Sequence, residues 1–183
     1  MTTPILMARH GETTYNAQER FQGQGDEAVL TEKGREQARE LAELAAQEPL
    51  VALYCSPVRR ARETAGIVGE RIGLEPLPDP RFAETNTGDW TDRLYSDIQR
   101  DDPEGFEAWQ HAGEGFRYPG GESLREQMDR VVDGLVDVTQ RGALPALIVC
   151  HRGTIRVALC HTQMRGLDVF SEIAVPNGAL IRL

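Results

Sequence analysis

The chain has 183 residues, of which 40% are hydrophobic and 27% are charged, and a chain of this size normally forms one domain around a single core. Its 20 Lys and Arg against 29 Asp and Glu give a net charge of −9, which argues against a nucleic-acid or anionic-membrane binder, because such binding needs widespread positive charge. The longest apolar run, residues 146–150, is far shorter than the roughly 20 residues that span a bilayer. We therefore expect one soluble domain over residues 1–183.

The start of the chain and its cysteines predict where the protein resides. Residues 1–10 lack a basic start followed by an apolar core of signal length, so we expect a cytoplasmic protein. Cys55, Cys150 and Cys160 are odd in number and widely spaced, which favours reduced thiols over a disulfide framework.

Short apolar runs alternate with amphipathic helices along the chain. The runs are typical of strands buried on both faces of a parallel sheet, and they cover residues 5–8, 50–55, 146–150 and 179–183. Helices are predicted after the N-cap Thr31, over about 57–71, and after Ser123, where Glu126 completes a capping box. This alternation predicts a three-layer α/β/α sandwich with a mostly parallel, doubly wound sheet.

Residues 76–121 break the alternation. The stretch has prolines at 76, 78, 80, 103 and 119, and it shows no long periodic pattern. We expect an insertion with short helices that forms a lid or a substrate-facing wall.

Three of the predicted strands are followed at once by polar residues, at 9–13, 56–60 and 151–153. Ligands of open α/β sheets bind outside the carboxyl ends of the strands, so these segments should converge. Together they supply two histidines and up to four arginines, while Gly11 and Gly153 would let backbone amides approach an anion. The pattern indicates a phosphoryl-transfer site.

At these positions the chain resembles the histidine phosphatase superfamily, in its phosphoglycerate-mutase-like branch. RHGETTYN at 9–16 is similar to the family's RHGxTxxN, and LTEKGREQA at 30–38 to LTxxGxxQA. SPVRRARETA at 56–65, PGGES at 119–123 and HRGTIR at 151–156 also resemble family segments and follow in the same order.

The resemblance implies a role for each matched residue. His10 would attack phosphorus and form a phosphohistidine that water later cleaves. Arg9, Arg60 and His151 would stabilise the charge on the equatorial oxygens, with Asn16 as a neutral donor and Gly11 in the phosphate loop. The neighbours Arg59 and Arg62 are expected at the surface.

The leaving group needs a proton from a nearby carboxylic acid. Glu84 is the candidate, because ETNTGDW at 84–90 resembles the family's ExxxGxW, although Thr87 replaces an aromatic residue; Glu12 competes for the role. Arg152 stands where the family usually has glycine, and it either contacts the phosphate or substrate or points to solvent.

Two other chemistries stay open at this point. CHRGTIR at 150–156 matches the CxxGxxR loop of cysteine phosphatases, with Cys150 as the nucleophile, but this leaves RHGETTYN unexplained. Zinc is a second alternative, from Cys150-His151 and Cys160-His161, although adjacent residues chelate poorly and His161 is expected at the surface, as is His111.

The resemblance leads us to expect a metal-independent phosphomonoesterase without a cofactor that acts on a small phosphorylated metabolite, such as a sugar phosphate, a glycosylated phosphoglycerate or α-ribazole phosphate. A mutase is the alternative, but ETNTGDW and residues 92–118 do not match the carboxylate-holding segments of the longer mutases. A binder without turnover is disfavoured because every catalytic position is filled. The resemblance also allows a homodimer.

Overall fold

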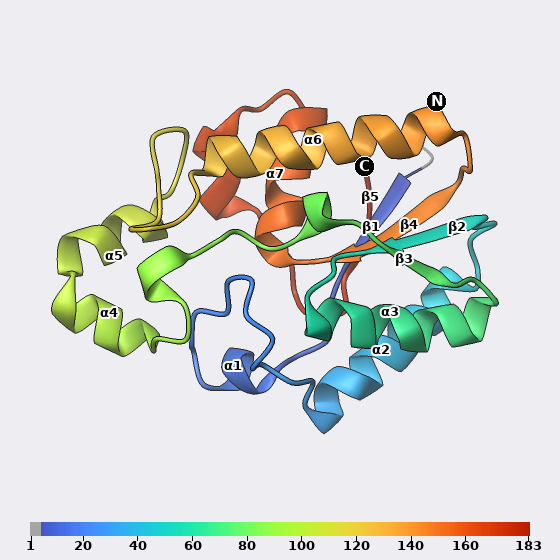
Figure 1. Ribbon diagram of the computed structural model, residues 1–183, viewed down its shortest axis with the longest axis horizontal. Coiled ribbons are helices and arrows are strands. Elements are labelled where there is room, and N and C mark those ends of the chain that lie inside the picture. Colours follow the sequence, from blue (N-terminus) through green and yellow to red (C-terminus); the bar gives the residue numbers. More distant parts are fainter. Residues whose placement is uncertain (1–4) are drawn as a thin grey trace.

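The computed structural model describes residues 5–183, and residues 1–4, on which part of the cytoplasmic expectation rests, lie outside the described residues. The polypeptide forms a five-stranded sheet in the order β3-β2-β4-β1-β5, covered by helices on both faces (Figure 1). The strands are β1 (Ile5–Arg9), β2 (Ala52–Cys55), β3 (Pro76–Pro78), β4 (Ala146–Cys150) and β5 (Leu180–Arg182). The predicted α/β/α sandwich with a mostly parallel sheet is confirmed.

The two faces of the sheet bury different side chains because successive residues of a strand point in opposite directions. Met7 and Ile148 belong to the hydrophobic cluster under α6 (Leu124–Arg141) and α7 (Arg152–Thr162). Ala8 and Val149 belong to the cluster under α2 (Glu32–Ala45) and α3 (Arg59–Ile72). Figure 1 shows the two helix pairs on opposite sides of the sheet.

The helix starts follow the capping chemistry of the sequence. The hydroxyl of Thr31 accepts a hydrogen bond of 3.0 Å from the amide of Gly34 at the start of α2. Ser123 and Glu126 form the predicted capping box of α6. Helix α3 begins two residues later than expected, and no side chain caps it.

Two strands differ from the prediction. β5 is antiparallel to β1 and only partly buried, so the last apolar run is not a doubly covered parallel strand. β3 lies within the stretch assigned to the insertion, and the sequence does not predict it because two of its three residues, Pro76 and Pro78, are prolines. It pairs only with β2, and an edge strand tolerates prolines because one side of its backbone needs no partner.

Residues 76–121 carry short helices, as expected. These are the 3₁₀ turns Pro80–Phe82 and Gly88–Trp90, together with α4 (Tyr95–Asp101) and α5 (Pro103–Gln110). The second 3₁₀ turn, α4 and α5 pack around a cluster that includes Phe21, Trp90, Phe106 and Tyr118, whereas Phe82 of the first turn belongs to the core under α6. Outside this stretch lie the short α1 (Thr14–Ala17) and a 3₁₀ segment at Leu167–Glu172.

Among residues 5–183, no helix combines the length and the apolarity needed to cross a membrane. The three cysteines are all free and buried, in line with the expectation of reduced thiols.

Helix α2 approaches the loop after β1 through two glycines. A Cβ on Gly34 would lie 2.0 Å from the carbonyl oxygen of Glu12, and a Cβ on Gly11 would lie 2.1 Å from the carbonyl oxygen of Gly34. Both contacts are with backbone, so neither can be relieved by turning a side chain. Gly34 and Gly11 therefore fix how closely the loop after β1 packs on α2.

This contact predicts opposite effects for two helical glycines. Gly34→Ala should lower the free energy of unfolding by about 2 kcal/mol or more, since it overpacks a backbone contact. Gly66→Ala, in α3, should raise it by up to about 1 kcal/mol, because nothing lies within 4 Å of its added Cβ and alanine favours the helix. Urea unfolding followed by tryptophan fluorescence measures both, and equal stabilisation by the two variants would contradict the contact.

Candidate active site

The loops after β1, β2 and β4 meet at one pocket with about 580 Å³ of empty space, open solvent included. The pocket brings together predicted residues from distant parts of the chain. Those in its lining are Arg9, His10, Asn16, Arg60, Glu84, Arg152 and Gly153. His151 lies directly behind, with its ring centroid 5.2 Å from that of His10, whereas Gly11 is not part of the lining.

His10 follows β1 and is 2% exposed. Its Nδ1 lies 2.7 Å from the carbonyl oxygen of Gly11, and a carbonyl only accepts, so Nδ1 carries the proton. Its Nε2 then has a free electron pair and accepts a hydrogen bond of 3.3 Å from Nε of Arg60. Burial, followed by the charges of Arg60 and Arg9, lowers the pKa of His10 well below its ordinary value. The ring is therefore neutral and held in one orientation.

Arg60, from α3, is 1% exposed and is held by backbone carbonyls. Its Nη2 donates to Gly23 at 2.7 Å and its Nη1 to Gly25 at 3.1 Å. Burial lowers the pKa of Arg60 to about 10, which leaves it charged at neutral pH. Its charge is thus fixed beside His10. The charges of Glu84 and Asp26 act on it, but within residues 5–183 it forms no direct ion pair with a carboxylate.

Besides Nε of Arg20, which also lines the pocket, two buried nitrogens at the site have no hydrogen-bond partner within residues 5–183. One is Nε of Arg9, whose Nη1 donates to the carbonyl of Val175 at 2.7 Å. The other is Nδ1 of His151, whose Nε2 lies 2.7 Å from the hydroxyl of Ser56. Since an unpaired buried polar group costs about 1–3 kcal/mol, these atoms are suited to an anionic ligand.

Asn16 and the two glycines occupy different roles in the site. The Oδ1 atom of Asn16 accepts from the amide of Thr13 and from Asn177, so its amide group is left to donate to the pocket. The amides of Gly11 and Gly153, which we expect to approach the anion, both have partners within the protein. The amide of Gly11 donates to Thr64 at 3.2 Å, and that of Gly153 donates to Glu84 at 3.2 Å.

Of the two acid candidates, only Glu84 lines the pocket. Its Oε1 accepts from the amide of Thr85 at 2.9 Å, and its Oε2 accepts from the amide of Gly153. Glu12 instead forms an ion pair of 2.8 Å with Lys33, which lowers the pKa of Glu12. The geometry places Glu84, and not Glu12, beside His10.

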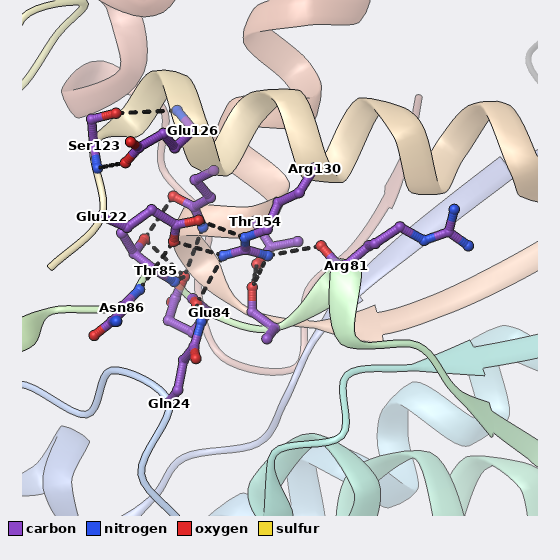
Figure 2. A network of polar contacts seen from close by, with 12 residues as sticks. Gln24, Arg81, Glu84, Thr85, Asn86, Glu122, Ser123, Glu126, Arg130 and Thr154 are labelled. Carbon is purple, nitrogen blue, oxygen red and sulfur yellow. Dashed lines mark hydrogen bonds and ion pairs between the residues drawn. The ribbon is translucent and has the colours of Figure 1, made fainter.

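A clamp centred on Arg130 of α6 fixes the loop that carries Glu84 (Figure 2). The guanidinium donates to the carbonyl oxygens of Ala83, at 2.8 Å, and of Glu84, at 3.0 Å. Its Nε forms an ion pair of 2.6 Å with Glu122, whose second oxygen atom accepts from the amide of Asn86. This ion pair is mostly shielded from solvent, so the loop is held on both sides of the acid.

Sequence reasoning missed several residues of the lining. Arg156 lies on the same helix as Arg152 and within the segment HRGTIR. Residues four apart on a helix lie on the same face, so the spacing from Arg152 could have predicted that Arg156 also lines the pocket. Arg20 and a set of aromatic residues carried no motif. These aromatic residues are Phe21, Tyr95, Tyr118 and Phe170.

The alternative chemistries do not fit the geometry. Cys150 is fully buried in the core cluster of the sheet, and burial raises the pKa of its thiol well above the ordinary value, so it is not a thiolate nucleophile. Within residues 5–183, no three His, Cys, Asp or Glu residues gather closely enough to hold a metal ion. His111 and His161 are exposed, as are Arg59 and Arg62.

Comparisons with known proteins show the family to which the chain belongs. The family model of the histidine phosphatase superfamily (branch 1) matches residues 5–183. The chain is 36% identical over 171 residues to a probable phosphoglycerate mutase from Enterobacter sp. (strain 638), which covers 92% of this chain and 77% of that protein. It is 35% identical over 173 residues to a glucosyl-3-phosphoglycerate phosphatase from Mycolicibacterium vanbaalenii, with coverages of 90% and 75%.

Solved structures give the same result. The mycobacterial glucosyl-3-phosphoglycerate phosphatase in complex with VO3 superposes with a TM-score of 0.89 and 30% sequence identity, over 96% of this chain and 90% of that one. With its fold, its matched motifs and its near-complete coverage by the family model, this chain belongs to the histidine phosphatase superfamily.

Proposed function

We propose that the chain is a metal-independent phosphomonoesterase that hydrolyses a small phosphorylated metabolite through a phosphohistidine at His10. The observation that carries the proposal is the neutral His10 ring, whose Nε2 electron pair is directed at buried, charged Arg60. Relatives named as phosphatases support hydrolysis as the reaction class.

In the first step, Nε2 of His10 gives up its hydrogen bond from Arg60, its electron pair forms a bond to phosphorus, and the bond between phosphorus and the ester oxygen breaks. The leaving oxygen takes a proton from the carboxyl group of Glu84, which lines the same pocket. In the second step, the Glu84 carboxylate takes a proton from water, and the water oxygen bonds to phosphorus as the bond between phosphorus and nitrogen breaks. Inorganic phosphate leaves, and both residues return to their starting states.

The fixed hydrogen-bond donors of the pocket stabilise the negative charge on the phosphoryl oxygens in both steps. Arg9 and Arg60 are held by backbone carbonyls before any ligand binds, so they need little reorganisation in the transition state. We assign the remaining equatorial contacts to Nδ1 of His151 and the side-chain amide of Asn16.

We further propose that residues 76–121 form the substrate-facing wall. Tyr95, Trp109 and Tyr118 from this stretch line the pocket and restrict the leaving group to a small molecule. The free cysteines support a cytoplasmic location. The single-domain organisation and the homodimer stay predictions.

Substitution of His10 tests the nucleophile. His10→Ala should reduce hydrolysis of p-nitrophenyl phosphate by at least about 10³-fold, because the residual donors can bind but cannot form the covalent intermediate. Assays contain EDTA and include His161→Ala, an exposed histidine, as the matched control. Retained activity in His10→Ala, or its loss in Cys150→Ser alone, would overturn the mechanism, and a requirement for added metal would contradict metal independence.

Substitution of Glu84 tests the acid. Glu84→Gln should slow alkyl phosphates by about 10²-fold or more, and p-nitrophenyl phosphate much less, because p-nitrophenolate leaves without needing a proton. The dependence of kcat/KM on leaving-group pKa across a series of esters measures this difference, with Glu12→Gln as the control. Equal slowing of all esters would move the acid to another residue.

A further inference from the structure

A second hollow adjoins the pocket at the start of α7. It has about 610 Å³ of empty space, open solvent included, and it is lined by Trp109, Gln110, Arg152, Arg156, Phe170 and Ser171. Arg152 and Arg156 line both this hollow and the His10 pocket. A ligand whose phosphate lies at His10 can therefore extend along these two arginines.

Arg152 and Arg156 are four residues apart on α7, where like charges destabilise a helix by about 0.2–0.5 kcal/mol. Neither arginine forms an ion pair with an acidic residue in the part of the chain that the structure describes. The two charges are thus kept together without a counterion.

Arg156 is fixed in place, whereas Arg152 is unrestrained. The Nε of Arg156 donates to Ile173 at 2.7 Å, its Nη2 donates to Ser171 at 3.4 Å, and its guanidinium lies 5.3 Å from the centre of the Phe170 ring. Arg152 makes no side-chain hydrogen bond within residues 5–183, and its side chain is partly exposed. Burial and then the charge of Arg152 lower the pKa of Arg156 to about 10.

The lining of the pocket carries more positive charge than one phosphate neutralises. Among residues 5–183, five arginines and one carboxylate, that of Glu84, line the pocket. A phosphomonoester dianion placed against His10, Arg9 and Arg60 leaves the pair on α7 uncompensated. In a chain with a net charge of −9, such a local excess indicates a ligand with further negative charge.

We propose that Arg152 and Arg156 bind a second anionic group of the substrate, so that the enzyme selects phosphomonoesters that carry a carboxylate or a second phosphate. This inference rests on the phosphomonoesterase activity proposed above. Arg156 supplies a fixed donor and Arg152 an adjustable one, which bidentate recognition of either anion can use.

The experiment compares matched esters on wild type, Arg152→Gln and Arg152→Glu. Each ester has a phosphate at one end of a chain of two to four carbons and a hydroxyl, a carboxylate or a second phosphate at the other. Wild type should prefer an anionic end over the hydroxyl end by about tenfold or more in kcat/KM, and the better anion identifies the source of the charge. Arg152→Gln should remove most of this preference, mainly through KM, and Arg152→Glu should reverse it.

The controls separate this inference from the proposed activity. Arg165→Gln removes an exposed arginine beyond the same helix and should leave the preference unchanged. If wild type fails to hydrolyse any ester, including p-nitrophenyl phosphate, the proposed activity is wrong. If wild type is active but shows no preference for an anionic end, the second-anion site is wrong. It is also wrong if Arg152→Gln slows all esters equally, because Arg152 then contacts the transferred phosphate.

Discussion

The hydrogen bond between Nδ1 of His10 and the carbonyl oxygen of Gly11 is the constraint on which the site depends. It fixes the tautomer in which Nδ1 carries the proton. The electron pair of the ring is therefore on Nε2, which accepts a hydrogen bond from Arg60. Its geometry depends in turn on the close packing of the loop after β1 against α2, where two glycines bring backbone against backbone. The His10 ring is therefore positioned by the core of the fold.

Buried positive charge is the second element of the account. Arg9 and Arg60 line the same pocket as His10 and donate to backbone carbonyls, and within residues 5–183 neither forms an ion pair with a carboxylate. The same charges and the burial keep the ring of His10 neutral, which a nucleophile requires. Glu84 is the one carboxylate of the lining, and Arg130 holds the loop that carries it without entering the pocket (Figure 2).

Much of this arrangement can be predicted from the sequence because it is encoded locally. The capping residues Thr31 and Ser123 predict where two helices begin. His10 and His151 follow the ends of two parallel strands, and because the topology brings those ends together, their positions predict the site. Long-range contacts are harder. The amide of Gly153 looked free for an anion, yet it bonds to Glu84, which is distant in sequence and is brought there by the insertion. Strand β3 could not be predicted because it contains two prolines, which a strand tolerates at the edge of a sheet.

The covalent intermediate tests the account most directly. Wild-type enzyme mixed with p-nitrophenyl phosphate and quenched in base within milliseconds should carry an acid-labile, base-stable phosphate, and peptide mapping should place it on Nε2 of His10. The account predicts this modification in wild type, and none in His10→Ala. Phosphate found on Cys150, or rapid turnover with no phosphorylated residue at any time, would contradict it.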